Sequence, residues 1–325
     1  MKVAVVDLGT NTCRLFLAEV ERDDVRSGAP AITVPSVVHT IERLTTVVRL
    51  GQGVDRAGRL EAAAVARTRD CLAGYAPRLE AFAPERRLLV ATSVLRDAGD
   101  GRAFLEAVQR DFSLPWRVLA GEEEGALAFR GGTAELVGTG PAPLVLVDIG
   151  GGSTEFAVGE PGAAPEFVRS LDVGVVRLTE RFIASDPPAS AEVSELVRFT
   201  AAAIEEAVPA TVRGAARGAV GVAGTYTTLV ANRLGLREYD SELVHGRVLS
   251  RADIDAAIAR FTALTNAERV RLPGIQPGRE DVILAGAIIA REALSAFGLA
   301  EVRCSEADIL EGAALGLAAG TLIAG

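Results

Sequence analysis

The apolar positions in the first half of the chain form short β-branched runs separated by turns and helix-like segments. Residues 3–6 have the pattern of a buried strand, 7–12 that of a tight turn, and 14–20 that of a second strand, so the pair is hairpin-like. Further strands are predicted at 31–38, 46–50, 87–92 and 116–119. Helices are predicted at 56–82, at 101–111 and from Glu122 onward.

The second half opens as the first does, with an apolar run at 143–147 that leads into a glycine-rich turn. Strands are predicted at 155–158, 166–171, 219–222 and 302–304. Helices are predicted at 175–183, 191–208, 226–234, 251–264, 267–272 and 281–297. The apolar run 309–324 contains Glu311 and is shorter than the ~20 residues of a membrane span, so we expect a buried helix.

One motif occurs in both halves: a β-branched run, an aspartate, an apolar residue, a glycine and then hydroxyl-bearing residues. We name residues 7–14 the first motif and residues 148–155 the second motif. A glycine after a strand lets the backbone approach a ligand, and successive N–H groups there bind anions. Hydroxyl donors are added by Thr10, Thr12, Ser153 and Thr154. Asp7 and Asp148 suit a Mg²⁺ ion that bridges to phosphate oxygens, and the repetition indicates duplicated halves.

Each motif could instead be an ordinary hairpin turn. Gly150, Gly151 and Gly152 weigh against that interpretation, because each glycine costs roughly 0.5–1 kcal/mol in regular structure. A third candidate loop, 221–227, follows a strand and opens a helix, where N–H groups can hold an anion. Its alternative is a tight turn with Thr225 as N-cap, and taken alone this loop favours the alternative.

Composition narrows the class of protein. A chain of 325 residues suggests two domains, and its net charge of −9 argues against nucleic-acid binding, which depends on clustered Lys and Arg. Three widely spaced cysteines and two histidines argue against a disulfide framework and a zinc site. The N-terminus lacks the pattern of a signal peptide. These features fit a reducing compartment such as the cytoplasm, with no membrane partner.

Several segments together resemble the exopolyphosphatase/guanosine pentaphosphate phosphohydrolase family. They are DLGTNT (7–12), ATSVLRDA (91–98), GEEEG (121–125), DIGGGSTE (148–155), GT (224–225) and SEADILEG (305–312). The resemblance extends over nearly the whole chain and is closest to short actinobacterial exopolyphosphatases. It implies an actin-like (ribonuclease H-like) duplicated α/β fold, with two domains flanking a deep cleft. It places the domains at 1–125 and 126–325, with the last helix, about 306–325, packing back on the first domain.

The resemblance also implies a set of site residues. Glu124 matches the family's catalytic glutamate, with Glu123 one position away as the alternative, and Glu155 matches a further carboxylate implicated in activity. Asp7 and Asp148 are the expected ligands of Mg²⁺ or Mn²⁺, both of which take oxygen ligands. The expected phosphate-binding residues are Gly9, Thr10, Asn11, Thr12, Ser93, Arg96, Gly150, Gly151, Gly152, Ser153, Thr154, Gly224 and Thr225.

These residues predict a hydrolase in which Glu124 activates water to attack the terminal phosphorus of polyphosphate or guanosine pentaphosphate. Two alternatives remain open. A kinase of the same fold also has paired Asp-Gly hairpins, but the GEEEG segment and Ser93–Arg96 fit a hydrolase better. A sensor that binds an alarmone without turnover would not need Glu124, Asp148 and Glu155. A homodimer is a family-based expectation.

Overall fold

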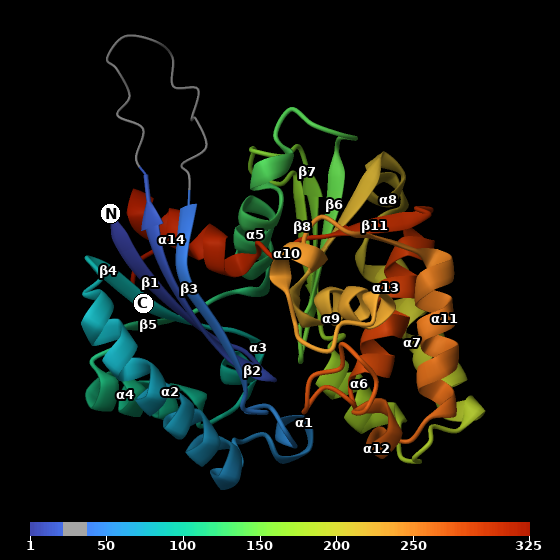
Figure 1. The fold of residues 1–325 in the computed structure, drawn as a ribbon, viewed down its shortest axis with the longest axis horizontal. Coiled ribbons are helices and arrows are strands. Elements are labelled where there is room, and N and C mark those ends of the chain that lie inside the picture. The colour runs from blue at the N-terminus through green and yellow to red at the C-terminus, as the bar shows by residue number, and fades with distance from the viewer. Residues whose placement is uncertain (22–37) are drawn as a thin grey trace. The chain divides into compact units, whose positions relative to one another are not determined.

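The computed structural model describes residues 1–21 and 38–325, and the chain divides into two compact units (Figure 1). Unit 1 consists of Met1–Ala120 and Ile309–Gly325, and unit 2 is Gly121–Asp308. The first stretch of chain and the last segment therefore belong to the same unit, and unit 2 is continuous in sequence.

The strands described in unit 1 form one sheet in the order β3-β2-β1-β4-β5. They are β1 (Lys2–Leu8), β2 (Thr12–Val20), β3 (Val38–Val47), β4 (Arg86–Ala91) and β5 (Trp116–Val118). β1 pairs antiparallel with β2 and parallel with β4, while β2 pairs antiparallel with β3. The first motif is thus the turn of the β1–β2 hairpin, beside the central parallel pair.

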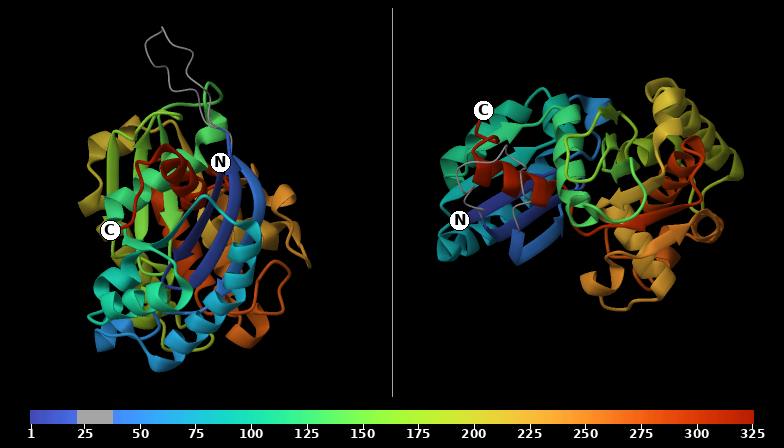
Figure 2. Two further views of the ribbon diagram at one scale, coloured as in Figure 1. Left: turned by 90° about the vertical axis from the view of Figure 1, so that its left-hand side faces the viewer. Right: turned by 90° about the horizontal axis from the view of Figure 1, so that it is seen from above.

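Helices cover both faces of this sheet. The described helices of unit 1 are α1 (Val54–Ala57), α2 (Ala62–Phe82), α3 (Ser93–Asp97), α4 (Gly101–Phe112) and α14 (Ile309–Ala319). The side chains of Ala4, Val6 and Leu8 share a core with those of Leu72 in α2 and Leu105 in α4. Alternate strand residues face the opposite side. α14, red in Figures 1 and 2, packs beside β1 and β2, so β1 is buried from both sides.

The sheet of unit 2 has the order β10-β11-β9-β6-β7-β8 among its described strands. They are β6 (Leu144–Ile149), β7 (Thr154–Gly159), β8 (Phe167–Leu171), β9 (Gly218–Val222), β10 (Val248–Ser250) and β11 (Glu301–Cys304). β6 pairs antiparallel with β7 and parallel with β9, and β7 pairs antiparallel with β8. The second motif is the turn of the β6–β7 hairpin.

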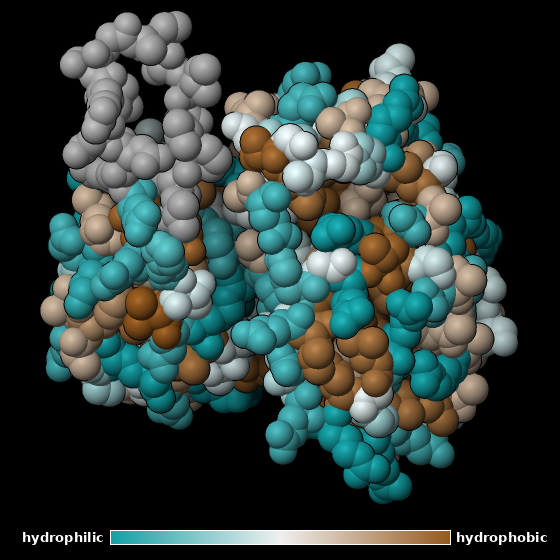
Figure 3. Space-filling view, turned by 45° about the horizontal axis from the view of Figure 1, so that its top comes forward, coloured by the Kyte–Doolittle hydropathy of each residue, from teal (hydrophilic) through white to brown (hydrophobic). Residues whose placement is uncertain are grey.

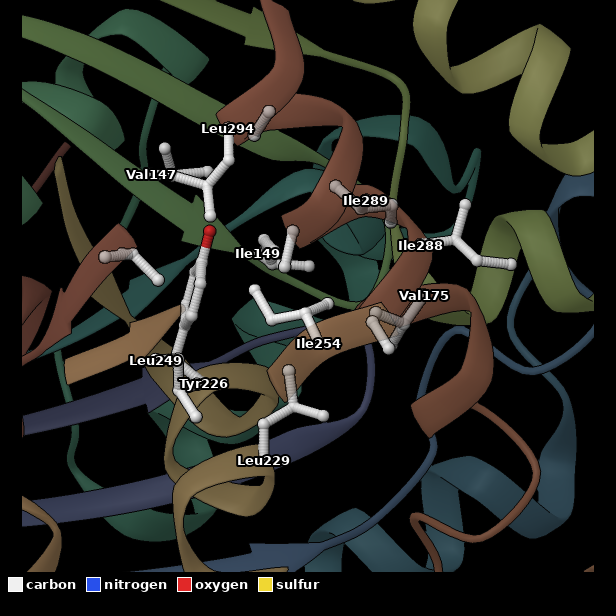
Figure 4. Close-up of a cluster of buried hydrophobic side chains, with 14 of the residues drawn as sticks. Val147, Ile149, Val175, Tyr226, Leu229, Leu249, Ile254, Ile288, Ile289 and Leu294 are labelled. Atoms are coloured by element: carbon white, nitrogen blue, oxygen red, sulfur yellow. The ribbon is translucent and has the colours of Figure 1, made fainter. Parts of the chain in front are cut away.

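Helices also cover both faces of the second sheet. Its helices are α5 (Gly121–Gly132), η1 (Ala134–Leu136), α6 (Val175–Phe182), α7 (Ser190–Ala207), α8 (Ala210–Ala215), α9 (Ala223–Leu234), α10 (Ser241–Val244), α11 (Arg251–Ala263), α12 (Asn266–Arg269) and α13 (Ile283–Ala296). Val147 and Ile149 of β6 lie in one core with Ile288, Ile289 and Leu294 of α13 (Figure 4). α5 packs on the sheet beside β6, β7 and β8.

The two sheets repeat one topology. In each, a hairpin is extended by a third antiparallel strand on one side and by two parallel strands on the other, so that β1 to β4 correspond to β6 to β9 and β5 to β11. This repetition is the actin-like (ribonuclease H-like) duplicated fold, and it confirms the α/β class expected from the sequence. The two motifs occupy the same place in their respective sheets.

Several boundaries differ from the sequence-based expectation. The helix predicted at 56–82 is wrong as one element, because Gly58 adopts φ 66° and ends α1 before α2 begins at Ala62. The strand predicted at 46–50 is also wrong, because β3 ends at Val47 and Arg49 has φ 51°. Of the strand predicted at 31–38, residues 31–37 lie outside the described residues. The short elements α8, α10 and β10 were not anticipated.

Within residues 1–21 and 38–325, no helix combines the length and the apolar character needed to cross a bilayer. The face drawn in Figure 3 intersperses hydrophilic with apolar side chains. Among the large apolar side chains that are exposed are Ile41, Leu234, Tyr239 and Leu243.

Candidate active site

The second motif is held against the start of α6 by all three of its glycine carbonyls. The amides of Val175 and Val176 donate to the oxygens of Gly150 and Gly151 over 3.0 and 2.9 Å, and Nε of Arg177 donates to that of Gly152 over 2.9 Å. In a trans peptide the N–H points opposite to the C=O. The N–H groups of Gly151, Gly152 and Ser153 therefore point away from α6, as an anion-binding concavity requires.

The first motif is built in the same way from a different partner. The carbonyl of Asn11 accepts from the amides of Val48 and Arg49 at 3.0 and 2.9 Å, and that of Thr10 accepts from Gly51 at 2.8 Å. The turns themselves match, since Gly9 donates to Thr12 over 3.0 Å and Gly150 donates to Ser153 over 2.9 Å. The segment 48–51, for which the sequence suggested no role, therefore orients the backbone of the first motif.

The two motifs differ in the residue that faces their aspartate across the hairpin. In the first motif Asp7 pairs in register with Arg14, whose Nε and Nη2 lie 2.8 and 2.6 Å from Oδ2 of Asp7. In the second motif Asp148 pairs in register with Glu155. Cross-strand partners share one face of a sheet. The guanidinium of Arg14 in unit 1 thus occupies the position at which unit 2 has the carboxylate of Glu155. Both Asp148 and Glu155 are buried.

A helix covers that face in each unit, and each helix carries a Glu-Gly pair. In α14 of unit 1, Glu311 forms an ion pair with Arg43 of β3. In α5 of unit 2, Gly125 lies directly against β7, because a Cβ added to it would be 3.2 Å from Cβ of Glu155. The preceding residue, Glu124, is buried. In unit 2, Asp148 and Glu155 pair across the hairpin, and the buried Glu124 lies on α5, the helix that packs on this sheet, whereas Asp7 and Glu311 of unit 1 are paired with arginines.

The three consecutive acids of α5 lie in different environments. The side chain of Glu122 is 58% exposed and lies 3.8 Å from Arg169. Glu123 is half-buried, and Glu124 retains 8% of its accessible surface. Glu155 is fully buried, and its Oε1 accepts a hydrogen bond of 2.7 Å from Ser170 on β8. Of the three acids in α5, Glu124 is thus the most buried.

The donor set of the second motif fits Mg²⁺. This ion takes oxygen ligands and is commonly bound by one or two carboxylates together with substrate phosphates. Asp148 and Glu155 supply two carboxylates next to a turn whose N–H groups suit phosphate. Asp7, the other expected ligand, has one oxygen engaged by Arg14. The carboxylates of the second motif are therefore the better candidates to hold the metal.

Four other residues that were expected to bind phosphate make hydrogen bonds to other parts of the protein. Oγ1 of Thr10 lies 3.1 Å from Oγ of Ser93, so these two residues from distant segments meet. Arg96 donates from Nη1 to the carbonyl of Leu119 over 2.9 Å. Thr154 donates its one hydroxyl proton to the carbonyl of Val173, so it orders the end of the second motif.

The third loop contains a residue that sequence reasoning left out. α9 begins at Ala223, with φ 67° there, so Thr225 lies in its first turn and not at the N-cap. The space that a Cβ on Gly224 would occupy is filled by the guanidinium of Arg279. A helix N-terminus and a guanidinium both attract anions. Gly224, Thr225 and Arg279 therefore lie together at the start of α9, where these groups could hold an anion.

Gly51 gives a direct test of the backbone support for the first motif. An alanine there would overlap Cγ2 of Thr10 and bring its Cβ within 3.3 Å of the Thr10 carbonyl oxygen. We expect Gly51→Ala to lower the free energy of unfolding by about 1–3 kcal/mol in urea titrations. Gly74→Ala, in α2 with nothing near its Cβ, is the matched control and should stabilise by roughly 0.5–1 kcal/mol. Equal effects of both changes would contradict the assigned contact.

Comparison with known proteins gives consistent matches over the whole chain. A family model described as the Ppx/GppA phosphatase family matches residues 31–319. Exopolyphosphatase 2 of Mycobacterium tuberculosis is 40% identical over 327 residues, which cover 98% of this chain and 98% of that protein.

Solved structures of similar proteins also match this chain over nearly its whole length. The crystal structure of an exopolyphosphatase-like protein matches with a TM-score of 0.88 and 32% identity, covering 99% of this chain and 100% of the other. The Ppx/GppA family member of Aquifex aeolicus matches with a TM-score of 0.78 and 30% identity, covering 100% of this chain and 99% of the other.

Proposed function

Because the chain belongs to the Ppx/GppA phosphatase family, we propose that it is an exopolyphosphatase, which releases orthophosphate from the end of inorganic polyphosphate by metal-assisted attack of water. The observation that carries the proposal is the asymmetry between its two motifs. Both motifs have backbone carbonyls held by a neighbouring segment, but only the second motif has an Asp–Glu pair in register, under the helix α5 that carries the buried Glu124. Both motifs are thus suited to bind phosphate, and unit 2 is suited to the chemistry.

The residues of unit 2 have distinct roles in this proposal. The N–H groups of Gly151, Gly152 and Ser153 bind oxygens of the terminal phosphoryl group and orient it. Glu124, which is buried on α5, accepts a proton from the attacking water. Ser170 fixes the side-chain orientation of Glu155 through its hydrogen bond. Arg279 and the start of α9 bind further phosphates of the chain.

Asp148 and Glu155 would hold the divalent cation. When bound, Mg²⁺ neutralises negative charge on the phosphate oxygens as the bond to the leaving group breaks. Chelation of the metal should therefore abolish turnover.

The proposal is tested by phosphate release from purified protein. We expect orthophosphate to appear from polyphosphates of several lengths in the presence of Mg²⁺, and the release to stop when EDTA is added. Guanosine pentaphosphate, the other family substrate, is assayed in parallel, and faster release from it would assign that activity instead. No orthophosphate from any of these substrates would refute the proposal.

Arg279 offers a test of substrate binding at the third loop. Replacing Arg279 with alanine should raise KM for polyphosphate about tenfold or more, because a charge-assisted bond to phosphate contributes roughly 1.5–3 kcal/mol. Arg237→Ala, which removes an exposed arginine from the same unit, should leave KM unchanged. Steady-state kinetics at two salt concentrations measures both. A KM for Arg279→Ala equal to that of Arg237→Ala would remove Arg279 from the site.

Two other classes of function give different results in the same assays. A kinase of this fold would bind ATP and transfer phosphate to a hydroxyl or carboxylate without releasing orthophosphate. A sensor would bind polyphosphate with no turnover over hours. The paired carboxylates of the second motif, together with the buried Glu124, favour the hydrolase over both.

A further inference from the structure

Two cysteines that are far apart in sequence meet inside unit 1. Cys13 is the second residue of β2 and follows directly on the turn of the first motif, while Cys71 lies on α2. Both side chains pack in the same hydrophobic core of unit 1. One helical turn after Cys71, the hydroxyl of Tyr75 donates to the carbonyl of Cys13 over 3.0 Å and lies 2.9 Å from Oγ1 of Thr46. These bonds hold α2 against β2 at the position of the two thiols.

The two thiols have unequal exposure and acidity. Cys13 is fully buried, whereas Cys71 is half-buried. Interaction with Cys13 lowers the pKa of Cys71, and interaction with Cys71 together with burial raises the pKa of Cys13. The thiolate is the reactive form of cysteine. Cys71 is therefore the nucleophile that solvent can reach, and Cys13 is the thiol positioned to react with it next.

We propose that Cys13 and Cys71 are a peroxide-oxidisable pair that forms a reversible disulfide in unit 1. The sulfur of Cys71 attacks one oxygen of hydrogen peroxide, the O–O bond breaks, and Cys71 becomes a sulfenic acid while the other oxygen leaves as water. The thiol of Cys13 then attacks the sulfur of Cys71, and the sulfenic oxygen leaves as a second water. Two thiols are oxidised and one peroxide is reduced to two waters. A dithiol such as dithiothreitol reduces the disulfide to two thiols by exchange and is itself oxidised to a cyclic disulfide.

The proposed disulfide between Cys13 and Cys71 would restrain the first motif. Cys13 pairs in register with Leu8, so the cross-link ties α2 to the two strands that carry the motif. Any effect on phosphate release rests on the proposed function, whereas the disulfide itself does not. Chemical readouts are therefore measured before activity.

The test treats the purified full chain with hydrogen peroxide and counts thiols after denaturation. The reduced chain has three cysteines, and the oxidised chain should retain one thiol, that of Cys304. Peptide mapping should find Cys13 joined to Cys71, and dithiothreitol should restore all three thiols. Three thiols after treatment, or a bond between two copies of the chain, would overturn the proposal.

Variants separate the two steps. Cys13→Ser should accumulate a Cys71 sulfenic acid that dimedone labels, and Cys71→Ser should give neither the label nor the disulfide. Cys304→Ala is the control and should form the disulfide as the wild type does. If Cys13→Ser fails to fold, mapping of the wild-type chain decides by itself. Disulfide formation in a chain without phosphatase activity would support the pair while refuting the proposed function.

Discussion

Replacing Glu124 with glutamine is expected to lower kcat for phosphate release by about 10²–10⁴-fold, with little change in KM. Glutamine keeps the size and the hydrogen-bonding capacity of the side chain but cannot accept the proton of the attacking water. Because glutamine has the same shape and Glu124 is buried, the change should remove proton transfer without displacing the substrate. Steady-state kinetics with polyphosphate and Mg²⁺ measures the effect.

The neighbouring acids of α5 are the natural controls for this change. Glu122→Gln removes an exposed carboxylate paired at a distance with Arg169 and should leave kcat near that of the wild type. Glu123→Gln should have an intermediate or small effect, since this side chain is only half-buried. A kcat for Glu124→Gln equal to that of Glu122→Gln would remove Glu124 as the base. A large loss in Glu123→Gln alone would move the role to Glu123.

Replacing Gly174 with alanine is expected to lower both stability and activity. The backbone of Gly174 is extended, with φ −126°, so alanine would be allowed locally. Its Cβ, however, would overlap the carbonyl oxygen of Gly151 and the carbonyl carbon of Gly152. The contact is between two backbone segments that hydrogen bonds hold together, so no side chain can move aside. We expect a loss of about 1–3 kcal/mol in the free energy of unfolding.

The rate of phosphate release should also fall in Gly174→Ala. If α6 is pushed away from the second motif, the glycine carbonyls lose their hydrogen bonds and the N–H groups are no longer held in one orientation. Gly214→Ala in α8 is the matched control, since nothing lies near its Cβ. Urea unfolding and phosphate release are measured on both variants. A Gly174→Ala protein with the stability and rate of Gly214→Ala would show that the contact between the two segments does not support the motif.

The sequence was sufficient to predict the duplicated hairpins. Both turns have a glycine two residues after an aspartate, and a β-branched run precedes each of them, so local pattern and turn chemistry agree. The repetition indicated duplicated halves, and the family resemblance implied the α/β class and the actin-like fold. The strand assignments near the motifs were also close to the observed ones, because β1, β6 and β7 are short, apolar and bounded by glycines.

What the sequence could not show is decided by contacts between distant segments. Arg14 and Glu155 stand at matching positions, but their opposition to Asp7 and Asp148 depends on strand register. Arg279 reaches Gly224 only through the packing of the loop before α13. Cys13 and Cys71 meet because α2 crosses β2, which no spacing of cysteines reveals. Packing between distant segments thus determines which residue faces each aspartate and places Arg279 beside Gly224.

The most direct measurement of the central claim is hydrolysis of polyphosphate in water enriched in oxygen-18, with Mg²⁺ present. The account predicts that the heavy oxygen appears in the released orthophosphate, because water attacks the terminal phosphorus held by the second motif. Label found in the shortened chain instead, or phosphate transferred to an acceptor other than water, would contradict it.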